Sequence, residues 1–167
     1  MTTPINNPDI RGEGKRVYYQ VGEYDTTQAE ATILADGNWI QLCQVEVNET
    51  NSRELEATED ACSGDEIGYT AGRRESGFTL TLNEFRLTNA NVRAFDDFAE
   101  NFGIVAFMVL DSDRDDPGTR GRVLNGLIGQ NDKNGPQKGV ATRSLEIKPA
   151  ARTEFRSARV YGSAVAP

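Results

Sequence analysis

The chain of 167 residues contains no histidine and only two cysteines, Cys43 and Cys62. Histidine is the commonest general base near neutral pH and a frequent metal ligand, so its absence excludes Ser-His and Cys-His catalysis and most zinc sites. Two cysteines are too few for a disulfide framework. Cys43 lies in an apolar pattern typical of a strand and is predicted to be a free thiol that packs as a small hydrophobe, although a bridge to Cys62 stays open. The sequence predicts no catalytic residue, no cofactor and no metal, and it does not favour an enzyme.

Long apolar runs and an excess of basic residues are also missing. The longest apolar run spans residues 104–110, far fewer than the roughly 20 residues that cross a bilayer, and residues 1–12 lack the apolar core of a signal peptide. We therefore expect a soluble protein without membrane contact. The net charge of -8 repels phosphates and argues against conventional nucleic-acid binding. No Walker loop, GxGxxG or nucleophile elbow is present.

Alternating and Val- or Tyr-rich runs between turn residues, together with sixteen glycines, predict a mainly β protein. The predicted strands are residues 16–21, 31–35, 39–48, 73–82, 104–110, 122–128, 140–148 and 154–161. The sequence Asp36-Gly37-Asn38 predicts a β-hairpin between the second and third of these strands, because Gly and Asn tolerate positive φ. The fully apolar run 104–110 predicts a central strand.

One segment, residues 90–102, has the period of an amphipathic helix. Thr88 or Asn89 is the expected N-cap and Gly103 the expected end. The apolar stripe consists of Val92, Phe95, Phe98, Ala99 and Phe102. The predicted fold is therefore an antiparallel β-sandwich or barrel with one flanking α-helix.

Domain organisation follows from the same pass. Residues 1–16 are predicted to form a flexible N-terminal arm, residues 17–162 one β domain, and residues 163–167 a C-terminal tail. The apolar pattern lapses over residues 49–72, where acidic side chains accumulate. Because connections without secondary structure rarely exceed about 15 residues, we expect an extended arm or a functional loop there that is ordered on assembly.

Two groups of acidic residues resemble functional sites, but neither sequence supports such a site. The run from Asp111 to Asp116 resembles the start of a calcium loop, but Asp116 and Arg122 occupy the positions where an EF-hand needs Gly and Glu. A solvated turn is the favoured interpretation. The carboxylates on the helix are Asp96, Asp97 and Glu100, and they are predicted to form its solvated face.

Polar side chains alternate with apolar ones along three of the predicted strands. If these strands share a sheet, its outer face carries Gln44, Glu46, Asn48, Thr79, Thr81, Asn83, Thr142, Ser144 and Glu146. The face is small, polar and neutral to acidic, and Lys148 comes only at its end. An ordinary solvent-facing sheet remains an alternative, although such sheets usually mix in Lys and Arg.

The order of segments carries a resemblance to a known family. The sequence Asp-Gly-Asn-Trp at 36–39 is followed by a long strand, an acidic segment, and Gly-Arg-Arg-Glu-Ser-Gly-Phe-Thr-Leu at 72–80. A Phe-rich helix, an apolar strand and Ala-Thr-Arg-Ser-Leu-Glu-Ile-Lys-Pro at 141–149 complete the series. Over roughly residues 31–162 this layout resembles the tail tube (major tail) proteins of long-tailed bacteriophages.

The resemblance implies a β-sandwich subunit that closes into hexameric rings, and these rings stack into a hollow tube for genome passage in the virion tail. Related rings form the inner tubes of contractile tails and of type VI secretion. A homo-oligomer assembled in the host cytoplasm is then expected, with tape measure, terminator and distal tail proteins as further partners. DNA would pass transiently and without sequence specificity, and the polar face above would line the lumen.

The same resemblance suggests where subunits and rings contact one another. Acidic residues of the 49–72 segment would meet basic residues elsewhere and help to set the stack. The candidates are Glu54, Glu56, Glu59, Asp60, Arg73, Arg74, Arg120 and Arg122. Two alternatives remain open: another tail component of related fold, such as a terminator or connector, and a β-barrel or sandwich module that binds a ligand through aromatic residues such as Trp39.

Overall fold

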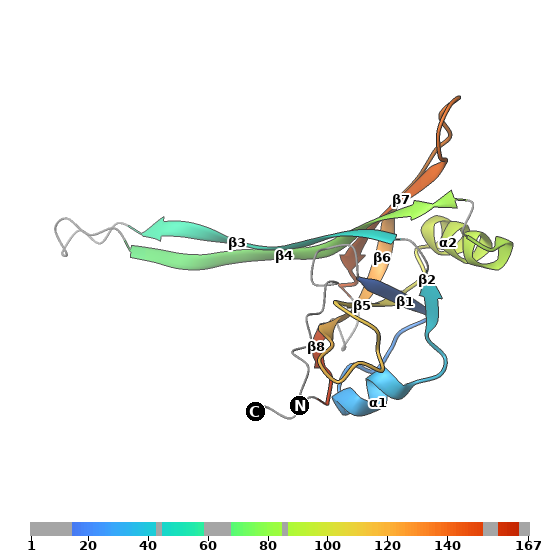
Figure 1. Ribbon diagram of the computed structural model, residues 1–167. Helices are drawn as coiled ribbons and strands as arrows, with labels where there is room; N and C mark the ends of the chain where they lie inside the picture. The colour runs from blue at the N-terminus through green and yellow to red at the C-terminus, as the bar shows by residue number, and fades with distance from the viewer. Residues whose placement is uncertain (1–14, 43–44, 59–67, 85–86, 152–156, 164–167) are drawn as a thin grey trace, which may run out of the picture.

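The computed structural model describes residues 15–42, 45–58, 68–84, 87–151 and 157–163 (Figure 1). Within these ranges the strands form one antiparallel sheet in the order β2-β1-β5-β6-β7-β4-β3, and β8 also pairs with β6. The strands are β1 (Arg16–Val21), β2 (Ile40–Leu42), β3 (Val45–Thr58), β4 (Gly68–Asn83), β5 (Val105–Leu110), β6 (Arg120–Asn134), β7 (Thr142–Pro149) and β8 (Ser157–Tyr161). The helices are α1 (Glu30–Ala35) and α2 (Asn89–Asn101). The prediction of a mainly β, antiparallel fold with a flanking helix is confirmed.

Strand β6 joins the two halves of the sheet. Its first part pairs with β5 and its second part with β7, and the register shifts between Ile128 and Gln130. The halves pack against each other through one apolar core, to which Phe107 contributes from β5 and Phe78 from β4. Helix α2 adds Phe95, which is fully buried. Because aromatic rings bury large apolar areas, this core supplies much of the stability of the sandwich.

Strand β5 lies at the centre of the fold, as predicted. All six of its residues are buried, because its second face is covered by another cluster that includes Ile33 and Leu34 of α1 and Trp39. The indole Nε1 of Trp39 donates a hydrogen bond to the carbonyl oxygen of Ile33 at 2.9 Å. A strand that is apolar throughout is typical of burial on both faces, which explains why the sequence marked it correctly.

The predicted hairpin around Asp36-Gly37-Asn38 is wrong. Residues 30–35 form helix α1, which buries Ile33 and Leu34 against the sheet, and the Asp36 carboxylate ends the turn by accepting the backbone N–H of Asn38 at 2.9 Å. The predicted strand 39–48 is divided into β2 and β3, which lie at opposite ends of the sheet order. A short alanine-rich apolar run fits a helix or a strand equally well, and only packing decides.

The 49–72 segment is largely strand, so of the two predicted forms residues 49–58 and 68–72 have the extended arm and not the functional loop. Strands β3 and β4 pair along their whole described length and extend from the body as a long two-stranded arm (Figure 1). The backbone is satisfied by pairing across the ribbon while most side chains of the arm remain exposed. No apolar alternation is needed under these conditions, which is why the sequence pattern lapses. Residues 59–67 and the N-terminal arm up to residue 14 lie outside the described residues.

The predicted helix is confirmed as α2, with Thr88 as its N-cap: the Thr88 hydroxyl accepts the backbone N–H of Asn91 at 3.2 Å. Its end differs from the prediction, because Phe102 and not Gly103 takes the left-handed conformation, with φ of 53°. Phe102 is 74% exposed and leaves the apolar stripe. The Phe98 ring occupies the space where a side chain on residue 103 would lie, so Gly103 is required for packing.

The remaining boundaries shift by a few residues. Strand β6 extends to Asn134, so residues 130–134, which lie between the predicted strands at 122–128 and 140–148, belong to a strand. Strands β7 and β8 agree with the predicted segments at 140–148 and 154–161 within the described residues. Cys43 and Cys62 lie outside these residues.

Candidate functional site

Eight of the nine residues predicted to share a polar face lie on three neighbouring strands in matching register. Glu46 and Asn48 of β3 lie opposite Thr81 and Thr79 of β4, and directly opposed residues of an antiparallel pair share a face. The next pairs are Thr79–Glu146, Thr81–Ser144 and Asn83–Thr142. The sheet therefore brings these eight side chains together on the face opposite the core, and we name this set the polar face. The ninth candidate, Gln44, lies outside the described residues.

Strand β6 extends the polar face by three residues that the sequence analysis missed. Gln130, Asp132 and Asn134 lie opposite Glu146, Ser144 and Thr142. The predicted strand ended at residue 128, because no apolar residue follows Ile128 in β6. The spacing of these polar residues, two positions apart, was the sequence signal that could have indicated a strand. The polar face thus spans four adjacent strands.

A cation does lie beside the polar face, but it is neutralised there. The Lys148 Nζ lies 3.0 Å from Glu75 Oε1 and 3.4 Å from Glu146 Oε1. Hydrogen bonds to Glu75 and, to a lesser extent, to Glu146 raise the pKa of Lys148, so its positive charge stays paired with the two carboxylates. The surface around it consequently presents little free positive charge.

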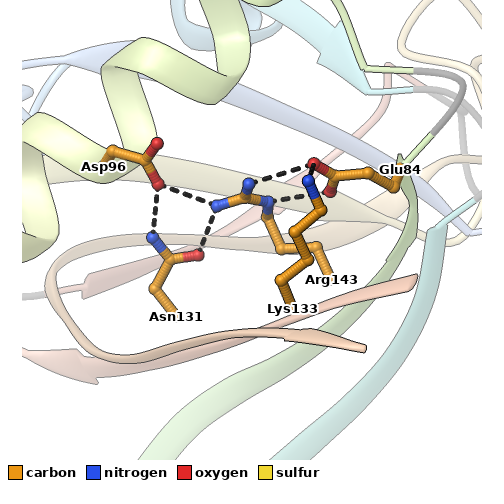
Figure 2. Close-up of polar contacts among 5 residues, drawn as sticks. All are labelled: Glu84, Asp96, Asn131, Lys133 and Arg143. Carbon is orange, nitrogen blue, oxygen red and sulfur yellow. Dashed lines mark hydrogen bonds and ion pairs between the residues drawn. The ribbon is translucent and has the colours of Figure 1, made fainter. Parts of the chain in front are cut away.

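The opposite face of the same strands carries a partly buried charge network at the margin of the core (Figure 2). Arg143 of β7 donates from Nε and Nη2 to the two Glu84 carboxylate oxygens at 2.9 and 3.1 Å. Its Nη1 donates to Asp96 Oδ1 of α2 at 2.8 Å and to Asn131 Oδ1 of β6 at 2.7 Å. Lys133 adds an ion pair to Glu84 at 3.3 Å. This network joins α2 to β6, to β7 and to the residue that follows β4.

The network changes the acidity of its members. Hydrogen bonds from Arg143 lower the pKa of Glu84, and the pKa of Arg143 is raised chiefly by its bonds to Glu84. Burial alone would raise the pKa of Asp96, but bonds from Asn131 and Arg143 together lower it. Asp97 and Glu100 are exposed as expected. The Asp96 side chain is 45% exposed but is also bonded to Asn131 and Arg143, which the prediction of a solvated helix face did not include.

The predicted contact residues fall in two regions. Glu54 and Glu56 are exposed on the arm, and Arg73 and Arg74 are exposed on β4. The Arg74 Nε donates to Asn51 Oδ1 across the ribbon at 3.1 Å. Glu59 and Asp60 lie outside the described residues.

Arg120 and Arg122 differ from each other although both belong to β6. Arg120 is exposed. Arg122 is buried, lies over the Phe78 ring at 5.8 Å, and its Nη1 is 3.2 Å from Glu49 Oε1. Arg122 therefore fastens the base of the arm to the body within one subunit.

A polar pocket of about 360 Å³ lies where the arm leaves the body. One wall comes from β3 and β4 and the other from β6 and β8. Its lining includes four arginines and two carboxylates in a chain whose net charge is -8. The lining residues are Glu49, Asn51, Arg74, Asp111, Arg120, Gly121, Arg122, Ser157, Ala158, Arg159 and Tyr161. This polar cavity does not have the apolar lining typical of a small-molecule site.

The aspartate-rich loop at 111–116 makes turns from its own side chains. The Asp113 carboxylate accepts the backbone N–H of Asp115 at 3.1 Å, and the Asp116 carboxylate accepts that of Gly118 at 2.8 Å. Over the described ranges, no group of three or more His, Cys, Asp or Glu side chains is placed to hold a metal ion. No helix there is long and apolar enough to cross a membrane.

Comparison with solved structures identifies the fold. No family model matches the chain, and no curated protein matches it. Among solved structures, a chain of the SPP1 tail tube matches with a TM-score of 0.57 at 12% identity, over 82% of this chain and 73% of that one. A chain of the anti-feeding prophage (AFP) baseplate matches with a TM-score of 0.59 at 12% identity, over 99% and 100%. A chain from the tail of the gene transfer agent (GTA) particle matches with a TM-score of 0.54 at 16% identity, over 93% of this chain and 97% of that one.

Three separate tail or baseplate assemblies thus contain a chain of this shape. At such low identities the likeness establishes the fold, and the predicted tail-tube-like fold is confirmed.

Proposed function

We propose that this protein is a structural component of a phage tail that assembles with itself into stacked rings, which form a hollow tube for DNA passage. One observation carries the proposal: a subunit with the tail-tube fold presents a continuous polar face over β6, β7, β4 and β3. Solved chains of this fold come from tail and baseplate assemblies, and six-fold symmetry was applied to two of these assemblies. A hexameric ring in the virion is therefore the proposed assembly.

The chemistry of the polar face suits a lumen. A conduit for DNA must repel or ignore phosphates, and hydroxyl, amide and carboxylate groups do so because they offer no exposed cation. Glu46, Asp132 and Glu146 contribute negative charge, whereas Lys148 is paired with Glu75 and Glu146. DNA would pass without sequence-specific contacts.

The free edges of the sheet support ring closure. In the described sheet, β2, β3 and β8 each have one neighbour, and an unpaired edge is a template for pairing with another chain. Pairing between subunits would remove these edges and give a closed ring. Tape measure, terminator and distal tail proteins are the proposed further partners, and the role requires no catalytic group or cofactor.

The test is electron microscopy of the purified protein together with size exclusion. Stacked rings about 100 Å across are expected from subunits of 18.3 kDa. A chain that stays monomeric at every concentration and salt would contradict the proposal and favour a ligand-binding module.

The lumen assignment has its own test in a chain that lacks native cysteines (Cys43→Ala, Cys62→Ala). Thr79→Cys would sit on the polar face and Thr32→Cys on the exposed side of α1 as a matched control. A maleimide carrying a bulky polymer should label both in free subunits and only the control in assembled tubes. Rapid labelling of Thr79→Cys inside tubes would contradict the lumen assignment.

The match to a baseplate chain over the whole length of both chains favours a second candidate. A tail component of this fold at one end of the tube, such as a terminator or connector, would form single rings. Rings that never stack, under conditions where the subunit is folded, would favour this candidate over the tube.

A further inference from the structure

The β3–β4 arm has two chemically different faces. Leu55 lies opposite Ala71, and Ala57 lies opposite Tyr69, so these four side chains share one apolar face. Leu55 is 67% exposed and Tyr69 is 63% exposed. Large apolar side chains that are exposed together on one face of a ribbon are typical of an interaction surface.

The other face of the arm is acidic. Glu54 and Glu56 are two residues apart on β3 and lie over Gly72 of β4. A Cβ on residue 72 would lie 3.2 Å from Glu54 Cβ and 3.4 Å from Glu56 Oε1, so the glycine leaves room for both side chains. Over the described residues, no ion pair joins either carboxylate to a cation of the same chain. The arm thus presents two adjacent, unpaired negative charges.

The arginine pocket at the base of the arm has the opposite character. Arg122 is paired with Glu49, whereas the exposed Arg120 and Arg159 have no ion pair within the described part of the chain. Tyr161 lines the same pocket and is 48% exposed. Two unpaired guanidinium groups beside an aromatic ring suit a ribbon that carries carboxylates and apolar side chains.

The acidic face of the arm cannot fill the pocket of its own subunit. Neither Glu54 nor Glu56 lines the pocket. Asn51 does line it, and at about 3.3 Å per residue Glu54 lies about 10 Å and Glu56 about 17 Å farther along the strand. The arm leads away from the body (Figure 1). A pairing between these two surfaces therefore requires two copies of the chain.

The geometry points to a contact between copies in which Glu54 and Glu56 on the arm of one subunit bind Arg120 and Arg159 in the pocket of a second subunit. This inference rests on the proposed self-assembly and names the surfaces that perform it. An inorganic anion in the pocket is the competing occupant.

The test is a charge exchange between arm and pocket. Glu54→Arg/Glu56→Arg and Arg120→Glu/Arg159→Glu should each raise the concentration needed for assembly by about tenfold or more at low salt, since attraction becomes repulsion at two sites per subunit. All four substitutions in one chain should restore assembly. A mixture of the two reversed proteins should also restore it, because each arm then finds a complementary pocket on the other protein. Asp97→Arg/Glu100→Arg and Arg93→Glu/Lys138→Glu make the same charge changes elsewhere and should assemble normally.

The outcomes separate this inference from the proposed function. Unaltered assembly by either reversed protein, or failure of both rescue experiments, overturns the contact while wild-type tubes still support the tube proposal. Loss of assembly only in the pocket variant, accompanied by weaker binding of inorganic phosphate, would assign the pocket to an anion and overturn the contact. A wild-type protein that never assembles overturns both. Circular dichroism should show folded subunits for each variant, and the milder Glu54→Gln/Glu56→Gln and Arg120→Gln/Arg159→Gln provide the same comparison if a reversed protein does not fold.

Discussion

Replacing Arg143 with methionine should lower the free energy of unfolding of the subunit by about 3 kcal/mol. The Arg143 side chain is only 6% exposed and Glu84 is 13% exposed, so the substitution leaves a nearly buried carboxylate without its partner. Breaking a buried pair in this way costs about 3–5 kcal/mol. We take the lower end because Asp96, the second carboxylate, is 45% exposed and regains water.

Thermal and urea unfolding of unassembled subunits would measure this loss, which corresponds to a fall in Tm of roughly 6–12 °C for a chain of this size. Lys133→Met is the matched control. Lys133 contacts the same Glu84 but is 60% exposed, so its loss should cost about 0.5 kcal/mol or less. The double variant Arg143→Met/Glu84→Gln should recover about 2 kcal/mol relative to the sum of the single changes, because no unpaired buried charge remains.

The same network predicts a pH dependence. Both carboxylates have folded pKa values below their ordinary values of 4.5 for Glu84 and 3.8 for Asp96. A lowered folded pKa contributes stability that is present above the unfolded pKa and is lost as the pH falls through the folded pKa. The difference in the free energy of unfolding between wild type and Arg143→Met should therefore reach its maximum above pH about 5 and decrease progressively below pH about 4. A loss under 1 kcal/mol, an equal loss in Lys133→Met, or a difference that is the same at pH 3 and pH 7 would refute the reasoning.

Three further predictions concern assembly and the backbone. Reversing Arg73 and Arg74 to Glu should impair polymerisation and leave folded subunits, since both are exposed on β4; sedimentation checks it, and unchanged tubes would count against it. Gly121→Ala should cost about 3 kcal/mol by overpacking, because its Cβ would overlap a carbonyl oxygen of β5, whereas Gly37→Ala has open space and should be nearly neutral in the same unfolding assay. Thr88→Ala should cost about 1 kcal/mol through loss of the α2 cap; no change in helix stability would contradict this.

Local patterns were sufficient where one environment covers a whole element. The buried strand β5, the capped helix α2 and the alternation of Thr79 and Thr81 were all predictable, because periodicity reports directly which side chains face a core. Arg143 carried a signal as well. It alternates in phase with the apolar Leu145 and Ile147 of β7, which places it on the inward side and calls for a buried partner.

Other features were beyond local patterns. Helix α1 was mistaken for a strand, because six residues with two adjacent apolar side chains fit either period. The sequence left the 49–72 segment open between an extended arm and a functional loop and did not reveal its strands, because a two-stranded ribbon exposed on both faces needs no alternation. The partners of Arg143 come from segments up to 59 residues away, and no local window reveals them.

By itself the sequence determined the acidity, the lack of histidine chemistry, the mainly β class and the alternation that brings eight polar side chains of β3, β4 and β7 to one face, since these depend on composition and on a two-residue period. Only the tertiary structure decided that this face spans four strands, that the acidic segment is a paired arm, and that arginines from β4, β6 and β8 meet in one pocket. The physical reason is that side-chain alternation is local, whereas strand order and the meeting of distant charges depend on how the whole chain packs.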